Sequence, residues 1–446
     1  MQSVPSIFVS IASYRDPELI PTLHDMINTA ERPENLNIAI FWQNDNDINT
    51  FLNQGMQLIE RKTHQGYPLY QLEYNRARVS VLSVHYYESR GACWARHMAE
   101  TLLLQDEAFF LQIDSHCRFI PHWDHEMIAM LDSLRAASPK PILSSYPPAY
   151  EPGENEIRKD YVSRMIFNLF TQEGIVQMLS TTITETAPVR CGYLAGGFIF
   201  SDGSFAREVP NDPNIFFIGE EIAMAARAFT HGYDIYAPHK ILLWHFYTRA
   251  EHSKVWSDHN NEAKETGAVD MAWWERDKIA KDRVCTLLDG DKDHRVLAPY
   301  TLGTQRSLSE FEYRLGINIK NRAVHPDAAG EKKVSFFTDL PTSHEDWLSS
   351  LISVNKKTLK VEKKEVDFTR EDVEWWHIGV YNPQNVAVMV EKVDPQNMSK
   401  TVTAVDEATF ELKLAFNTQT NPNAQTIRIC PYMRTQGWGD VVEKPW

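Results

Sequence analysis

The chain has 446 residues, of which 43% are hydrophobic, and its formal net charge is −15. This length allows two or three domains with their own cores. The acidic balance argues against a protein that binds nucleic acid or anionic membranes, because both need clustered Lys and Arg. Five scattered cysteines without a CxxC pair argue against a disulfide framework or a structural zinc site. We therefore expect a globular protein of a reducing compartment, the cytoplasm.

The beginning of the chain is interpreted as a strand and not as a targeting signal. It has no basic leader and no cleavage-site pattern, and no stretch reaches the ~20 apolar residues of a membrane span. We expect no transmembrane segment. The β-rich run at 7–12 is followed by the loop Ser13-Tyr14-Arg15-Asp16-Pro17, where Asp16 is suited to cap a helix that begins at Pro17.

Apolar runs and helical patterns alternate as far as residue 250. Strand-like runs lie at 37–42, 79–84, 109–113, 141–146, 193–201, 234–237 and 241–244. Helical patterns lie at 90–104, 124–134 and about 219–231. This alternation predicts an α/β fold with a parallel sheet, whose functional loops follow the carboxyl ends of the strands. We assign residues 1–250 to one Rossmann-like domain.

The composition and residue pattern of the sequence change twice beyond that domain. Residues 251–330 are polar and partly helical, and we interpret them as a bridging segment packed on the first domain. From residue 331 to 446, short alternating runs are separated by turn residues. That pattern predicts a separate β-sandwich of about 100 residues, the usual size of this architecture.

The triplet Asp114-Ser115-His116 ends the apolar run at 109–113. Residues two apart on a strand lie on the same side, so Asp114 and His116 can face one ion. An oxygen and a nitrogen ligand suit Mn²⁺ or another divalent cation, which would stabilise a departing nucleoside diphosphate. Asp-x-His is also common by chance, and on spacing alone a capping aspartate beside a hydrogen-bonded histidine is the simpler interpretation.

A third ligand is sought among histidines late in the same domain. His245 again ends an apolar run, although a hydrogen-bonded core histidine has the same appearance in sequence. On sequence grounds three others compete for this role: His231, His239 and His252.

Glu220 and Glu221 follow a glycine at a predicted helix start, where the positive end of the helix dipole favours carboxylates for structural reasons alone. The functional interpretation is that Glu220 grips sugar hydroxyls, or that a carboxylate orients the acceptor. Gly196 and Gly197 have no side chains, so they would leave room for a ligand beside these carboxylates, or would form a bulge.

Three arginines lie at predicted strand-to-helix junctions: Arg15, Arg90 and Arg96. Guanidinium groups match phosphate geometry, so the cluster favours diphosphate binding, although a surface ion pair explains any one of them. In the loop from Ser13 to Arg15, Tyr14 could pack on a base. Three tryptophans either line an acceptor groove or belong to a core: Trp256, Trp273 and Trp274.

Six segments carry a family resemblance. In order across residues 6–250 they are SIASYRDPEL, RGACWARHMA, FFLQIDSHCRFIPHWD, GGFIFSDGSF, IFFIGEEIAMAARAFTHGYDIYAP and LLWHFYTR. They resemble the polypeptide N-acetylglucosaminyltransferase family, whose eukaryotic members modify hydroxyproline on a ubiquitin-ligase adaptor. The chain is more distantly similar to the polypeptide N-acetylgalactosaminyltransferases, which share an Asp-Ser-His triplet, a Gly-Glu segment and a late metal-binding histidine.

The resemblance implies a GT-A fold, a UDP-sugar donor, a divalent metal and retention of anomeric configuration. By matching motif it makes Asp114, His116 and His245 the metal ligands and Glu220 a contact of the donor sugar. It extends to Arg15, Arg90 and Arg96 as contacts of the nucleotide or diphosphate. No residue stands out as a covalent nucleophile, so the implied reaction is a front-side transfer in which the leaving phosphate helps deprotonate the acceptor hydroxyl.

We therefore expect a retaining, metal-dependent transferase that moves N-acetylglucosamine or a related hexosamine from a UDP-sugar to a hydroxyl of a protein or glycan. One alternative is a metal-dependent nucleotidyltransferase or hydrolase that uses the same Asp, His and His. Another is a non-catalytic glycan-binding protein with the β-sandwich as its recognition module. The sequence leaves the donor sugar, the acceptor, the linkage and the oligomeric state open.

Overall fold

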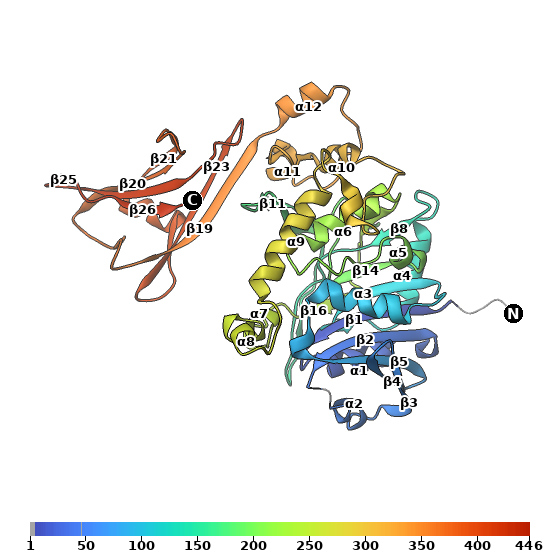
Figure 1. Cartoon of the computed structure of the whole chain (residues 1–446). Helices are drawn as coiled ribbons and strands as arrows, with labels where there is room; N and C mark the ends of the chain where they lie inside the picture. The colour runs from blue at the N-terminus through green and yellow to red at the C-terminus, as the bar shows by residue number, and fades with distance from the viewer. Residues whose placement is uncertain (1–4, 46) are drawn as a thin grey trace. The chain divides into compact units, whose positions relative to one another are not determined.

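A computed structural model describes residues 5–45 and 47–446, which form two compact units (Figure 1). The first unit runs to Leu315 and also includes Lys332–Leu340, whereas the second consists of Gly316–Glu331 and Pro341–Trp446. Most of the segment interpreted as a bridge thus belongs to the first unit, and its last residues belong to the second. Within the described residues, no helix is long and apolar enough to cross a membrane.

A ten-stranded sheet forms the centre of the first unit, in the order β13-β15-β8-β14-β6-β1-β2-β5-β4-β3. Its strands are β1 Ile7–Tyr14, β2 Leu36–Asn44, β3 Gln57–His64, β4 Tyr67–Tyr74, β5 Ala77–His85, β6 Phe109–Asp114, β8 Pro141–Leu143, β13 Val189–Cys191, β14 Phe198–Asp202 and β15 Asp234–Ala237. Neighbouring strands from β6 through β1 and β2 to β5 are parallel, but β14 runs antiparallel to β6 and β8. The fold is therefore a mixed α/β fold.

The sheet is mixed, so the prediction of a parallel sheet is wrong. The hairpin of β3 and β4 shows one reason. Only Gln65 and Gly66 separate the two strands, and both have positive φ, 49° and 91°. A two-residue turn of this kind joins antiparallel strands, because parallel strands need a crossover of a dozen or more residues.

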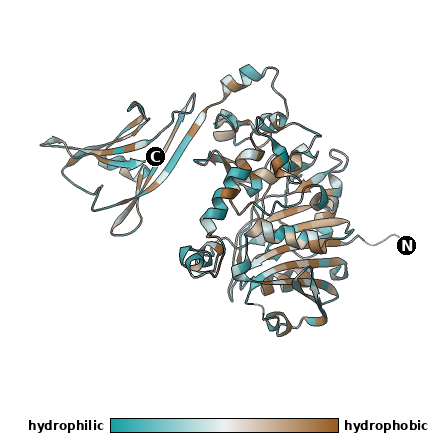
Figure 2. Cartoon of the chain, viewed as in Figure 1, coloured by the Kyte–Doolittle hydropathy of each residue, from teal (hydrophilic) through white to brown (hydrophobic). Residues whose placement is uncertain are grey.

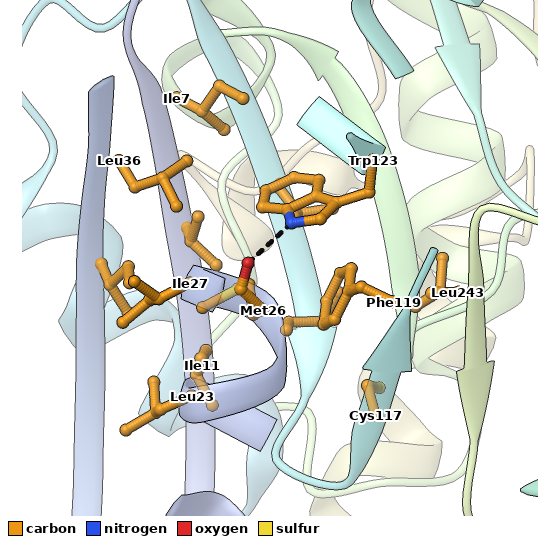
Figure 3. Close-up of a cluster of buried hydrophobic side chains, with 14 of the residues drawn as sticks. Ile7, Ile11, Leu23, Met26, Ile27, Leu36, Cys117, Phe119, Trp123 and Leu243 are labelled. Atoms are coloured by element: carbon orange, nitrogen blue, oxygen red, sulfur yellow. Dashed lines mark hydrogen bonds between the residues drawn. The ribbon is translucent and has the colours of Figure 1, made fainter. Parts of the chain in front are cut away.

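Helices supply the rest of the first unit's core. Those in the first unit are α1 Leu19–Thr29, α2 Asn49–Leu52, α3 Ala92–Leu103, α4 Trp123–Ser133, α5 Ser204–Glu208, α6 Glu220–Thr230, α7 Val255–Asp258, α8 Asn261–Glu265, α9 Trp273–Leu287 and α10 Leu308–Leu315. In α1, buried Leu23, Met26 and Ile27 recur at helical spacing. Figure 3 shows them beside Trp123 of α4, whose indole Nε1 donates to the Met26 carbonyl at 2.8 Å.

The parallel pairing of β1 with β6 positions the candidate site. Ala12 of β1 lies opposite Asp114 of β6, so the loops that follow both strands meet at the same edge of the sheet. Figure 2 shows hydrophobic residues concentrated along these central strands. Beyond Asp114 the chain forms β7 (Cys117–Phe119), which pairs antiparallel with β16 (Leu243–His245).

Two small antiparallel pairs of strands in the first unit lie between β8 and β13. β9 (Tyr150–Glu151) and β10 (Ile157–Arg158) form a small hairpin, and β11 (Val162–Phe170) pairs antiparallel with β12 (Val176–Ile183). The end of β12 near Val176 contributes to the cleft described below.

The second unit contains two antiparallel sheets that share one hydrophobic core. One sheet has β19 Ser353–Glu362, β22 Val402–Ala404 and β23 Thr409–Thr418, and the other has β20 Val373–Tyr381, β21 Ala387–Val393, β24 Thr426–Met433, β25 Gly437–Trp438 and β26 Val442–Pro445. Buried Leu412 from the first sheet and Ile378 and Ile429 from the second belong to the same cluster. The assignment of this unit to the β-sandwich fold class stays a prediction.

Short elements precede these sheets in the second unit. They are β17 Ile317–Asn318, β18 Ala323–Val324, α11 Pro326–Ala329 and α12 His344–Ser350.

Candidate active site

A cleft of about 440 Å³ opens where β1 and β6 end. Its wall comes from segments far apart in the sequence, namely the ends of β1 and β6, the turn before β14, the start of α6, and β16 with the residues that follow it. Its polar lining residues are Tyr14, Asp16, Arg96, Asp114, Ser115, His116, Tyr146, Gln177, Glu220, Glu221, His245, Tyr247, Arg249, Ser253 and Lys254. Such a concave surface with convergent polar groups is the usual form of a ligand site.

Asp114, His116 and His245 converge in this cleft. Each offers one ligand atom, and these atoms lie within 4.8 Å of one another. The Nε2 atom of His245 lies 3.1 Å from His116 Nε2 and 3.1 Å from Asp114 Oδ2. Burial lowers the pKa of His245 to about 4, so its ring is neutral near pH 7. One carboxylate and two imidazoles in this arrangement could hold a divalent cation.

Asp16 fixes the orientation of His116, a role that the sequence analysis did not assign. Its Oδ2 atom lies 2.7 Å from His116 Nδ1 and accepts from the Ser115 hydroxyl at 2.7 Å. Burial by itself would raise the pKa of Asp16, but the hydrogen bond and the charge of His116 lower it. The carboxylate therefore takes the Nδ1 proton as its partner and leaves the Nε2 lone pair facing the cleft, as in carboxylate–histidine–metal sites.

Arg96 of α3 links two acidic residues of the cleft. Its guanidinium is 4% exposed and donates to Asp114 Oδ1 at 2.8 Å and to Glu220 Oε1. Because a buried carboxylate needs a paired charge, Arg96 allows Asp114 and Glu220 to lie together at the floor of the cleft. Arg96 was predicted to contact the diphosphate. In the structure its guanidinium forms ion pairs with these two carboxylates.

Gly196 and Gly197 pass directly beside these carboxylates. A Cβ atom on Gly197 would lie 2.9 Å from Asp114 Oδ2, closer than side chains tolerate, and one on Gly196 would overlap the Glu220 carboxylate. The glycine pair therefore brings the backbone against the acidic floor, where a larger residue would displace it.

Glu221 is a second buried carboxyl group of the cleft. It accepts from the Tyr146 hydroxyl at 2.5 Å and from the Gly196 N–H at 2.9 Å. Burial raises the pKa of Glu221 to about 7. The Glu221 carboxyl is therefore partly protonated near pH 7.

Tyr14 and Arg15 are both fixed by Asp258 of α7. The Tyr14 hydroxyl donates to Asp258 Oδ2 at 2.7 Å, and Arg15 donates to the same oxygen at 2.8 Å. The Arg15 guanidinium also lies 4.3 Å from the centre of the Tyr86 ring. Tyr14 lines the cleft, whereas Arg15 lies beside it.

The structure does not bring Ser13 and Arg90 into the cleft. Ser13 is buried on the opposite side of β1 from Tyr14. Arg90 is exposed, lies 5.7 Å from the centre of the Trp94 ring and borders a separate hollow of about 370 Å³. The three arginines predicted to bind one diphosphate therefore do not converge.

Two cations that do line the cleft follow His245 in the sequence. Arg249 lies 3.7 Å from Asp16 Oδ2, and its buried Nε atom has no hydrogen-bond partner among the described residues. Lys254 also lines the cleft. Their place directly after a predicted site strand, in FYTRAEHSK, was the signal that sequence reasoning passed over.

Comparison with known proteins gives one family match. A family model described as Glycosyltransferase (GlcNAc) matches residues 6–68 and 53–321, which together cover more than half of the chain. A search of curated proteins gives no match. Among solved structures, S. aureus TarS, residues 1–349, is similar at 10% identity with a TM-score of 0.32, over 63% of this chain and 69% of that chain.

Proposed function

The chain belongs to the glycosyltransferase (GlcNAc) family, and from this premise we propose that it moves N-acetylglucosamine from a UDP-sugar to a hydroxyl group of a protein or glycan, with a divalent cation and with retention of configuration. The observation that carries the proposal is the convergence of Asp114, His116 and His245 on one point of the cleft.

The cluster fits a cation by its donor chemistry. Asp16 sets the tautomer of His116, and the neutral His245 ring keeps a nitrogen lone pair available. The set of one oxygen and two nitrogens suits Mn²⁺ better than Ca²⁺ or Mg²⁺, which prefer oxygen ligands. When bound, such an ion would stabilise the negative charge that develops on the leaving diphosphate.

Residues of this chain would bind the two ends of the donor. Arg249 and Lys254 would supply positive charge for the diphosphate, since both line the cleft. Glu220 would accept from sugar hydroxyls while Arg96 holds its carboxylate in place. The backbone at Gly196 and Gly197 leaves room for the sugar to approach that floor.

The carboxyl groups of the cleft favour a front-side transfer. Four line it, and each already has a partner: Asp16 with His116, Asp114 and Glu220 with Arg96, and Glu221 with Tyr146. We therefore assign none of them as a covalent nucleophile. In the proposed step the bond from the sugar's anomeric carbon to phosphate breaks, the bond to the acceptor oxygen forms on the same face, and the acceptor proton passes to the leaving phosphate oxygen.

The acceptor would enter past an aromatic wall of the cleft. Phe217 and Trp256 line it, their ring centres are 5.9 Å apart, and they are 54% and 41% exposed. Exposed rings at a cleft mark a surface for another molecule. The six sequence segments quoted above resemble the hydroxyproline-modifying members of the family. A hydroxyproline-containing protein is therefore the first acceptor to test.

A donor screen tests the proposal. Hydrolysis of UDP-GlcNAc, UDP-GalNAc, UDP-Glc and UDP-Gal would be followed with and without Mn²⁺, in the native protein and in Asp114→Asn. We expect UDP release that depends on Mn²⁺ and on Asp114 and is fastest with UDP-GlcNAc. Equal turnover by Asp114→Asn would remove the metal site from the proposal.

The product separates this proposal from a nucleotidyltransferase. A transferase releases UDP and extends an acceptor, whereas a nucleotidyltransferase that uses the same three ligands releases pyrophosphate. Pyrophosphate as the product would overturn the proposal. Family membership favours the transferase over a non-catalytic glycan-binding protein.

A further inference from the structure

The second unit carries aromatic side chains on the outer face of its larger sheet. Along β20, Trp376, Ile378 and Val380 point into the core, so Trp375 and His377, which alternate with them, point outward. In an antiparallel sheet with one buried face, the outer face ordinarily carries polar residues. We call the outward set Trp375, His377, Tyr381, Tyr432 and Trp438 the aromatic face.

Three rings of the aromatic face form a row across three strands. Trp375 of β20 is opposite Tyr432 of β24, and Tyr432 is opposite Trp438 of β25. Trp375 stacks on Tyr432 with ring centres 5.0 Å apart and planes 15° apart. Trp438 meets both rings edge-on at 5.0 and 5.2 Å and is 56% exposed. The row thus fixes a large ring in an exposed position.

The face continues along β20 with His377 and Tyr381. The His377 Nε2 atom lies 3.0 Å from the Tyr381 hydroxyl, and both side chains close over Gly379. A Cβ atom on Gly379 would lie 2.7 Å from the Tyr381 ring and 2.9 Å from His377 Nε2. The glycine is therefore what allows these two rings to lie against the sheet.

The charged groups at the edges of the face already have partners. Arg428 donates to Glu443 at 2.6 Å and lies 4.5 Å from the centre of the Tyr381 ring. Lys392 lies 4.7 Å from the centre of the Trp375 ring. Lys392 and Arg428 thus each lie over one ring of the face, Glu443 balances the charge of Arg428, and the Trp438 ring stays open to a ligand.

We propose that the aromatic face binds a neutral oligosaccharide that contains N-acetylglucosamine. A sugar ring has apolar C–H faces and a rim of hydroxyls, which match flat rings bordered by His377, the Tyr381 hydroxyl and Arg428. The choice of this occupant rests on the proposed function, because the first unit would act on or produce saccharides of that class. The face would hold a glycan acceptor or product near the enzyme and thereby raise its effective concentration.

A glycan array with the full chain tests this inference. The native protein, Trp438→Ala, Trp438→Phe and Trp274→Ala would be applied to N-acetylglucosamine oligomers, including triacetylchitotriose, and to anionic glycans. Trp274, which the sequence analysis considered for an acceptor groove, does not line the cleft; it is a matched control, since it is 48% exposed and lies in the first unit. We expect the native protein to retain neutral oligomers, Trp438→Ala to lose about tenfold in affinity, and Trp438→Phe and Trp274→Ala to stay within about threefold.

Several outcomes would overturn the inference. They are no retention of any oligomer by the native protein, equal retention by Trp438→Ala, or a preference for anionic glycans. Light scattering supplies another test, because a halved mass in Trp438→Ala would make the face a contact between two copies of the chain.

UDP-sugar hydrolysis on the same samples keeps the two proposals apart. Asp114→Asn should lose hydrolysis and keep oligomer binding, while Trp438→Ala should keep hydrolysis. Trp438-dependent binding without any hydrolysis would refute the proposed function alone, and Asp114-dependent hydrolysis without binding would refute this inference alone.

Discussion

The cleft of the first unit and the aromatic face of the second present their side chains in opposite ways. In the cleft, polar groups are buried, and residues far apart in the chain hold one another, as Arg96 holds Asp114 and Glu220. On the aromatic face, half-exposed rings contact neighbours on adjacent strands, as Trp375 contacts Tyr432.

The difference teaches how each surface should respond to substitution. A substitution that removes a polar group from the cleft leaves its buried partner without a hydrogen bond or ion pair. The effects of such substitutions should therefore be large, and those of neighbouring residues should not add independently. A ring removed from the aromatic face leaves solvent in its place, and the effect should stay local. The predictions below probe this contrast, beginning with the largest expected effect.

Asp114→Asn should lower UDP-GlcNAc turnover about a hundredfold or more, because it removes both a metal ligand and the carboxylate partner of Arg96. Steady-state UDP release measures it. Asp202→Asn is the matched control, since Asp202 also follows a strand of the sheet, pairs with an arginine and is, like Asp114, 27% exposed. Similar losses in both variants would mean that the effect comes from the fold and not from the cleft.

Asp16→Asn should weaken activation by Mn²⁺ about 10–100-fold at saturating donor, because the amide no longer holds the Nδ1 proton of His116 as a carboxylate does. The Mn²⁺ concentration for half-maximal activity measures this effect. Asp124→Asn changes a buried carboxylate that accepts from the N–H groups of Glu31 and Arg32, outside the cleft. An unchanged Mn²⁺ requirement in Asp16→Asn would rule out its orienting role.

Trp256→Ala should raise the acceptor KM about fivefold while hydrolysis of the donor alone stays within about twofold, since the ring lies on the exposed wall of the cleft. Transfer assays at varied acceptor concentration give the two values. Trp274→Ala serves again as the exposed control. A loss of donor hydrolysis equal to the loss of transfer would place Trp256 at the donor instead.

Glu221→Gln should change how stability depends on pH. A carboxyl whose pKa is about 7 when folded and about 4.5 when unfolded stabilises the fold fully at low pH, and this contribution falls away as pH rises from about 4.5 to 7. Glutamine removes that part of the fall, about 1–3 kcal/mol. Denaturant unfolding at pH 5 and pH 8 measures it, with exposed Glu185→Gln as control. Parallel pH profiles for the native protein and Glu221→Gln would contradict the raised pKa.

The sequence predicted a strand correctly where the pattern of apolar residues lay within that one strand. The apolar run ending at Asp114 predicted a strand with two outward ligands, and period-two alternation predicted the strands of the second unit. The helix after β1 begins at Leu19, two residues later than expected. Asp16 Oδ1 still accepts from the Glu18 N–H at 3.0 Å, as a capping side chain does, while its Oδ2 atom contacts His116.

The sequence by itself determined the α/β class, the family segments and the Asp114–His116 pair, because strand spacing and residue type are local properties. Only the tertiary structure showed which of the four histidines lies beside His116, since the register of β16 on β7 sets His245 opposite Cys117. It also placed Arg249 in the cleft, which Arg90 does not line, and brought Asp16 Oδ2 to 2.7 Å from His116 Nδ1. These outcomes depend on which distant strands pair and in which register, and that is fixed by packing of the whole sheet rather than by any one segment.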